Sequence, residues 1–301
     1  MPSRIRLFVL FQFLFASLIC DAQTANCTNW KFFNLPASVA KSTFPMGINR
    51  WGTVVGYAQD ATTCCKFFGF IRYSNGNTKT YLFPHTSLTL LSKRNALGVT
   101  VGSYAGAPDG LVLSGSSTAT VDYPGASATM VQGINDQHTM VGIFTFGDFS
   151  FYYDGFQLKD GVFTTLHYPG SMTTSATSIS NNGVIVGWYR NAIHRRYQGF
   201  LLANGVYKTL DNPKATSGDV DGTYLNDINS AGVIVGTYNS IVSHTTNISG
   251  FIYIKGTFKD IKVPKFTYSR VEGINDSGYV TGMAFNYSGS GSETGFTAHC
   301  Q

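Results

Sequence analysis

Histidines and carboxylates are the side chains that most often bind metals or move protons in enzymes, and here they form no recognisable pattern. Six histidines are spread over 301 residues, and none has the H-x-x-x-H or H-E-x-x-H spacing of a metal site. Asp and Glu together number 16, and Glu occurs only at Glu272 and Glu293. Asp136, Asp227 and Asp276 stand in or beside repeated turns, where backbone hydrogen bonding explains an Asp. The sequence therefore predicts no catalytic residue, no metal and no cofactor.

Two short segments resemble functional loops without completing them. Asp219 and Asp221, followed by Gly222, look like half of a calcium loop, but no Glu follows to complete it. A plain loop is the favoured interpretation, and a calcium ion is the alternative. Ser-Gly-Ser-Ser at 114–117 is not a G-x-S-x-G nucleophile elbow and is predicted to be a turn.

Several aromatic side chains and one arginine lie in connecting segments whose sequences vary strongly. Exposed aromatics on variable loops are typical of binding surfaces, so these residues are candidates for a ligand platform. The alternative is that they end a strand and pack inside the fold. The candidates are Tyr57, Tyr104, Phe144, Trp188, Tyr189, Arg195, Tyr197, Tyr238 and Tyr287.

The elements that would position these residues come from an internal repeat in three parts. The first part is I-N-x-x-G-x-x-V-G, whose last glycine occurs at 56, 102, 142, 187, 236 and 282, in steps of 46, 40, 45, 49 and 46. The second is Gly followed by an apolar residue, as in Gly155-Phe156. The third ends on proline, as in 163–169, which reads F-T-T-L-H-Y-P. Such regular spacing indicates a repeat architecture.

Each repeat predicts four strands, which we call A to D. The β-branched and aromatic runs favour strands, and Asn followed by Gly predicts a hairpin turn between A and B. Glycine inside a strand marks a close backbone approach, and proline ends strand D because it has no N–H to donate. The aromatic candidates fall at the connections between strands B and C.

Four antiparallel strands per repeat of 40 to 50 residues are typical of a β-propeller. The chain ends after strand C of the sixth repeat, and the missing strand D, W-K-F-F-N-L-P, stands at residues 30–36. A ring explains this order, because the first strand then completes the last blade. We therefore predict an all-β, six-bladed β-propeller with four antiparallel strands per blade, closed by the N-terminal strand. An open β-solenoid and a pair of sandwiches are the alternatives.

These motifs resemble the HAF-type extracellular repeat of bacteria, with the best matches at 133–170, 179–213 and 228–264. The resemblance covers nearly all of residues 23–301 and implies a secreted bacterial protein of unknown activity. Three departures weaken it: Arg94 replaces Ile, His138 replaces the turn Gly, and Leu111 replaces Phe. These departures put the inner hairpin of the second repeat in doubt, but not the ring.

The N-terminus has the pattern of an export signal. Arg4 and Arg6 precede an apolar run and a small-residue cleavage site, which predicts a signal peptide over 1–22. A lipoprotein anchored at Cys20 is the weaker alternative. The run is too short to span a membrane, and no later stretch could. Residues 23–301 are therefore expected to form one domain, secreted to the periplasm or outside the cell.

Four cysteines remain after the predicted cleavage, and export favours disulfides. Aligning the first strand on its proline and the last on its Gly-Phe places Cys27 and Cys300 at the same point, where other blades have the turn between C and D. We therefore predict a Cys27–Cys300 disulfide. Cys64 and Cys65 are adjacent and could form a strained vicinal disulfide, stay reduced or pair between molecules. The vicinal bond is narrowly favoured.

The amino-acid composition limits the classes of ligand that the protein is expected to bind. Charged residues make up 12% of the chain, about half the usual share, and the net charge of +5 is scattered without a basic run, which argues against nucleic acid. We expect a monomeric, non-enzymatic binding module whose ligand is a glycan, a cell-wall component or a protein. The alternatives are a secreted hydrolase or lyase with its site at the central channel mouth, and a purely structural envelope protein.

Overall fold

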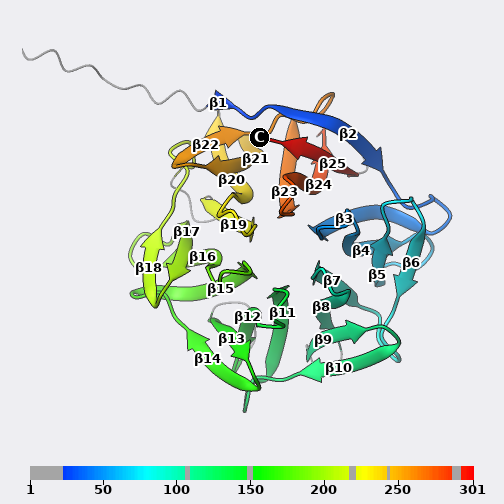
Figure 1. The fold of residues 1–301 in the computed structure, drawn as a ribbon, viewed down its shortest axis with the longest axis horizontal. Helices are drawn as coiled ribbons and strands as arrows, with labels where there is room; N and C mark the ends of the chain where they lie inside the picture. The colour runs from blue at the N-terminus through cyan, green and yellow to red at the C-terminus, as the bar shows by residue number, and fades with distance from the viewer. Residues whose placement is uncertain (1–22, 106–108, 148–151, 217–221, 243–244, 287–292) are drawn as a thin grey trace, which may run out of the picture.

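The protein is a ring of six sheets arranged around a central axis, five of them four-stranded and one five-stranded (Figure 1). The computed structural model describes residues 23–105, 109–147, 152–216, 222–242, 245–286 and 293–301. Within these ranges there are strands, turns and bends but no helix. The six-bladed β-propeller predicted from the repeat is confirmed.

Strands A lie innermost and strands D outermost in every blade, and neighbours within a blade are antiparallel. Strands A are β3 (Ala40–Ile48), β7 (Thr89–Arg94), β11 (Ala128–Ile134), β15 (Ser171–Ile179), β19 (Thr223–Ile228) and β23 (Tyr268–Ile274). Strands B are β4 (Val54–Asp60), β8 (Val99–Tyr104), β12 (Met140–Thr145), β16 (Ile185–Asn191), β20 (Ile234–Val242) and β24 (Tyr279–Phe285). Strands C are β5 (Phe67–Arg72), β9 (Asp109–Ser114), β13 (Asp154–Lys159), β17 (Tyr197–Ala203), β21 (Thr245–Ile254) and β25 (Thr294–Cys300). Strands D are β6 (Thr78–Tyr81), β10 (Ser117–Val121), β14 (Val162–Leu166), β18 (Val206–Thr209), β22 (Thr257–Asp260) and β2 (Cys27–Phe33).

The core lies between blades, and the second part of the repeat builds it. The apolar residue after each strand-C glycine is fully buried, at 0% exposure in all six blades. The glycine leaves room for the next blade: at Gly69, for example, Leu91 of β7 occupies the space that a Cβ would need. The buried residues are Phe70, Leu111, Phe156, Phe200, Phe251 and Phe296.

Every strand A carries a β-bulge at the same repeat position. In β11, Val131 pairs with Gly142 and Gly133 pairs with Val141, so that Gln132 has no partner on β12. The bulge brings a strand-A carbonyl onto the repeated glycine of strand B, and a Cβ on Gly142 would overlap the carbonyl oxygen of Met130. The repeated glycine is thus required within each blade, rather than by crowding of blades at the axis.

The repeated Asn joins each turn to the next blade. In the first repeat, Asn49 Oδ1 accepts hydrogen bonds from the backbone of Trp51 and Thr53, and its Nδ2 donates to the carbonyl of Asn95. The same link between blades runs from Asn95, Asn135, Asn229 and Asn275. In the fourth repeat Ser180 replaces Asn, and its hydroxyl accepts from Val184 N of its own turn.

The repeats that depart from the sequence pattern, at Arg94 and His138, form the same hairpins as the other repeats. Strands β7 and β8 form the inner hairpin of the second blade, where Asn95 Oδ1 accepts hydrogen bonds from the backbone N–H of Leu97 and Val99. His138 adopts a φ of 60°, the left-handed conformation that Gly supplies in other turns. The doubt about the second hairpin is therefore resolved in favour of the regular blade.

The first strand closes the ring. Strand β2 pairs antiparallel with β25, so that the blade of β23, β24 and β25 gains its strand D from the other end of the chain (Figure 1). The short strand β1 (Gln23–Thr24) adds a second link, which the repeat did not predict. It pairs in parallel with β22 of the preceding blade.

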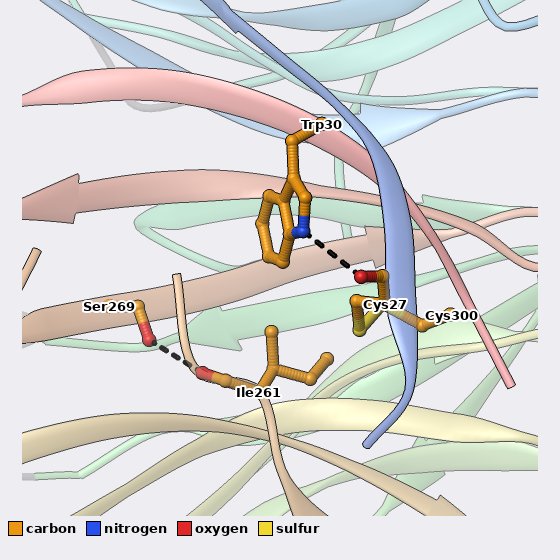
Figure 2. Close-up of a disulfide and its surroundings, with 5 residues drawn as sticks. All are labelled: Cys27, Trp30, Ile261, Ser269 and Cys300. Carbon is orange, nitrogen blue, oxygen red and sulfur yellow. Dashed lines mark hydrogen bonds between the residues drawn. A yellow bond between two sulfur atoms is a disulfide. The ribbon is translucent and has the colours of Figure 1, made fainter. Parts of the chain in front are cut away.

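The Cys27–Cys300 disulfide is confirmed, and it stands where other blades have the turn between C and D (Figure 2). The two residues are partners in the β2–β25 register, with Cα atoms 4.1 Å apart. A register shift between Thr28 and Lys31 accompanies Asn29 at a φ of 56°. The indole of Trp30 donates to the carbonyl of Cys27 at 3.1 Å (Figure 2).

The disulfide should stabilise the ring substantially, because it spans 273 residues of sequence. Replacing Cys27 and Cys300 by Ser should lower the free energy of unfolding by about 2–5 kcal/mol, since the unfolded chain gains freedom when the loop opens. Urea denaturation of the purified protein measures this loss. A Cys64→Ser/Cys65→Ser variant is the matched control and should keep the parent stability. Equal stability of the Cys27/Cys300 variant and the parent would contradict the closure role.

Candidate functional site

A cavity of about 480 Å³ occupies the axis on the side of the B–C connections. Its inner lining comes from the six bulges, because each bulged residue, freed from pairing with strand B, lines the channel. All six innermost strands therefore contribute one side chain each at the same level. These residues, which we call the bulge ring, are Met46, Ser92, Gln132, Thr177, Asn226 and Glu272.

The residue that follows the bulge-ring residue in each strand A closes the channel at the inner end of the cavity. Three of the six are glycines, at 47, 133 and 273, and a Cβ on Gly273 would lie 2.9 Å from the Cα of Gly47. The others are Lys93, Ser178 and Asp227. Because the strands approach so closely here, only these three positions place side chains at the constriction.

A buried ion pair fills the constriction. Lys93 Nζ lies 3.1 Å from Asp227 Oδ2 and donates to the carbonyl of Met46 at 2.9 Å and to that of Glu272. Asp227 Oδ1 accepts from Ser178 Oγ at 2.5 Å. Both charges are thus paired and hydrogen-bonded, as burial requires. The pair separates the cavity from a smaller hollow of about 80 Å³ beside the A–B turns.

Aromatic rings form one wall of the cavity. Trp188 of β16 and Tyr224 of β19 line it with ring centroids 5.5 Å apart and planes at 75°. Tyr197 and Tyr153 do not line the cavity but contact Trp188, with centroids at 5.3 and 6.1 Å. Tyr57 lines the cavity from β4. Aromatic pairs in edge-to-face contact hold each other in fixed orientations, so the wall is pre-organised.

Amides and hydroxyls add hydrogen-bonding groups to the lining. Gln132 Oε1 accepts from Ser175 Oγ at 3.0 Å, which turns its amide nitrogen to the other side. Asn226 Nδ2 donates to the carbonyl of Val271 at 2.9 Å, so its carbonyl oxygen is the free end. Asn239 of β20 also lines the cavity. Both donors and acceptors are therefore offered to a ligand.

Two charged groups of β23 line the cavity besides Lys93. Glu272 belongs to the bulge ring, and burial raises the pKa of its carboxyl above the ordinary value, with Asp227 adding to the rise and Arg270 and Lys93 opposing it. Arg270 stands two residues earlier and is exposed. Burial and the charge of Glu272 raise the pKa of Tyr57 to about 12, so the phenol stays protonated at neutral pH.

Strand pleating divides the sequence-predicted aromatics into two groups. Side chains one residue after the strand-B glycine reach the cavity, as Tyr57 and Trp188 do. Those two residues after it point to the other face, because direction alternates along a strand. The second group packs against the neighbouring strands and is not part of the cavity lining: it consists of Tyr104, Phe144, Tyr189 and Tyr238.

The second group has a packing role. Tyr104, Phe144 and Tyr189 each stack on the aromatic residue that precedes the proline after strand D, with centroids 3.5 to 3.8 Å apart. Tyr238 is 4% exposed, and its hydroxyl donates to Asp260 at 3.3 Å. These contacts match the packing alternative that the sequence left open.

The remaining predicted residues lie elsewhere. Arg195 occupies an exposed turn between β16 and β17 at a φ of 52° and does not line the cavity. Tyr287 and the calcium candidates Asp219 and Asp221 fall outside the described residues. No group of three metal-ligating side chains occurs in the described ranges. The same ranges hold no helix long and apolar enough to cross a membrane.

The vicinal disulfide expected for Cys64 and Cys65 is not formed. Both are free, exposed thiols with Sγ atoms 3.3 Å apart. Cys65 has a φ of 62°, and the hydrogen bond with Cys64 raises the pKa of its thiol. Adjacent residues reach disulfide geometry only with difficulty, which is the physical reason that the expectation was weak.

Sequence reasoning missed the bulge ring and the Lys93–Asp227 pair. When the six repeats are aligned, each set occupies one column of the alignment. The bulge-ring residues stand two residues before the Ile of Ile-Asn, and Lys93 and Asp227 stand one residue before that position. The first column is polar in five of six copies, although its neighbours belong to a buried strand. The second is glycine in three copies and charged in two. Comparing the repeats column by column would have singled out both positions.

Comparison with known proteins supports the fold alone. No protein-family model matches the chain, and a search of curated proteins finds no match. Solved structures with the same architecture include a protein of unknown function from Dyadobacter fermentans, 8% identical, with a TM-score of 0.53 over 92% of this chain and 99% of that one. A neuraminidase-like protein of A/little yellow-shouldered bat/Guatemala is 9% identical, with a TM-score of 0.52 over 92% and 99%. TolB from Acinetobacter baumannii is 11% identical, with a TM-score of 0.52 over 82% of this chain and 64% of its own.

The Lys93–Asp227 pair should be energetically coupled. Asp227→Ala leaves a buried ammonium without its carboxylate and should lower the free energy of unfolding by about 3–5 kcal/mol. A Lys93→Met/Asp227→Ala variant removes both charges and should recover most of that loss. Urea unfolding of the two single variants and the double variant gives the coupling energy. If the two single losses simply add in the double variant, the pair does not act as a unit.

Proposed function

We propose that the protein is a secreted, non-enzymatic binding module whose ligand is a small glycan held in the central cavity. The observation that carries the proposal is the aromatic wall of Trp188 and Tyr224 in the same cavity as the amide groups of Gln132 and Asn226, each of which is hydrogen-bonded to the protein at one end. The apolar faces of a sugar ring pack on aromatic side chains, and its hydroxyls bond to amides and carbonyls.

The size and form of the cavity support a small ligand. Ligand pockets are typically concave spaces of roughly 300–1,000 Å³ lined by apolar groups and a few placed polar ones. The cavity, at about 480 Å³, is within this range. The ion pair of Lys93 and Asp227 closes its inner end, so a ligand enters from the side of the B–C connections and stops at the bulge ring.

A hydrolase is the second candidate, and one observation favours it. Glu272 is a half-buried residue of the cavity lining, and the pKa of its carboxyl is raised, as that of a general acid would be. Glycoside hydrolysis ordinarily needs a second carboxylate, however. The other carboxylate whose charge acts on Glu272 is that of Asp227, which is bound to Lys93, Ser178 and the backbone N–H of Ile274. A binding role therefore accounts for more of the lining than catalysis does.

Export, the HAF-type resemblance and the monomeric state are part of the same proposal. The disulfide between Cys27 and Cys300 is typical of proteins that mature outside the reducing cytosol. This supports the signal peptide predicted over residues 1–22, which lie outside the described part of the chain.

A glycan array followed by titration calorimetry tests the binding function. Trp188→Ala should weaken binding of the best array ligand at least about tenfold, because the variant loses the stacking surface at the centre of the wall. Trp51→Ala is the matched control, since Trp51 is 60% exposed on an A–B turn at the opposite end of the axis.

The control should bind as the parent protein does, and circular dichroism should show that both variants are folded. Absence of any glycan ligand, or unchanged affinity in folded Trp188→Ala, would refute the proposed site. A parallel assay of the parent protein and Glu272→Gln on a panel of glycosides tests the hydrolase alternative. Turnover that Glu272→Gln abolishes would establish catalysis instead.

A further inference from the structure

We infer that the ligand of the central cavity is an acidic glycan, in which a sugar carboxylate pairs with Arg270. The inference rests on the proposed glycan-binding function and names the chemical class of its ligand. It would make Arg270 the residue that determines specificity, with Trp188 and Tyr224 providing the stacking surface. Guanidinium and carboxylate groups match in geometry and form strong, charge-assisted hydrogen bonds.

Arg270 is available for such a ligand, whereas Lys93 is not. The ammonium of Lys93 is bound to Asp227 and two backbone carbonyls. Arg270 takes part in none of the five ion pairs found within the described ranges, and its exposed side chain lines the cavity. The cavity therefore offers one uncommitted cation, and a ligand carboxylate is the natural complement.

The position of Glu272 does not oppose this assignment. Glu272 lies on the same strand two residues from Arg270, and its carboxyl is in none of those five ion pairs either. Its charged and titratable neighbours are Arg270 on β23, Lys93 on β7, Asp227 on β19 and Tyr57 on β4. A protonated Glu272 carries no charge and can donate a hydrogen bond to a sugar carboxylate.

Arg270 and Glu272 together predict how the affinity for an acidic ligand depends on pH. The pKa of Glu272 is raised, so its carboxyl takes up a proton at a higher pH than an ordinary Glu. As the pH falls through this pKa, the negative charge disappears from the cavity and an acidic ligand binds more tightly. As the pH rises, the ionised Glu272 repels the ligand. A neutral sugar of the same shape should lack this dependence.

The test uses paired probes: an array of uronic-acid oligosaccharides and their carboxyl-methylated, neutral counterparts, with calorimetry on the best pair. The parent protein should bind the acidic member at least about tenfold more tightly. Arg270→Gln should lose that preference while it keeps affinity for the neutral member within twofold. Arg50→Gln, an exposed arginine at the opposite end of the axis, carries the same change of net charge and should behave as the parent does.

The outcomes separate the two proposals. If neutral members bind as tightly as acidic ones, or if folded Arg270→Gln keeps the acidic preference, the inference is overturned and glycan binding stands. If no member of either set binds, both are refuted. Glu272→Gln provides the independent readout: it should abolish the gain in affinity for the acidic ligand that the parent protein shows as the pH falls. An unchanged pH profile would contradict the role of Glu272.

Discussion

The contact between a strand-B glycine and a strand-A carbonyl is the constraint on which this structure depends. Each innermost strand carries one residue too many for its partner, and the resulting bulge presses a carbonyl onto the neighbouring strand. Only glycine leaves room there. The same bulge turns one side chain per blade toward the axis. A packing requirement within the blade thus creates the lining of the cavity, and the bulge ring differs in residue type from blade to blade because its members do not pair with strand B.

Two kinds of link hold the blades in a ring. Asn side chains cap their own A–B turns and also bond the next blade, and the link from Asn275 to Asn49 joins the last repeat to the first. At the rim, β2 and the disulfide tie the two ends of the chain together. The inner links fix the spacing of the blades, and the outer ones prevent the first and last blades from separating. A rigid ring of this kind suits a pre-organised cavity.

The architecture could be predicted from the sequence because its determinants are local and repeated. The steps between repeated glycines predict the blades, and the displaced strand D predicts both the closure and the Cys27–Cys300 bond. The site was harder, since a side chain's direction depends on strand register. Tyr189 and Trp188 are neighbours in sequence, yet one packs between strands and the other lines the cavity. The bulge positions leave a signal only when the repeats are compared with one another, and the parallel pairing of β1 depends on contacts that no local pattern reveals.

Hydrogen–deuterium exchange, with and without the tightest-binding acidic oligosaccharide, tests the central claim most directly, because it locates the ligand without any substitution. The account predicts slower exchange in peptides that contain the bulge ring and the aromatic wall, at 130–133, 186–189, 224–227 and 270–273. Exchange at the A–B turns around Asn49, Asn95 and Asn229 should not change. Protection confined to those turns, or to the exposed turn at Arg195, would place the ligand outside the cavity and contradict the account.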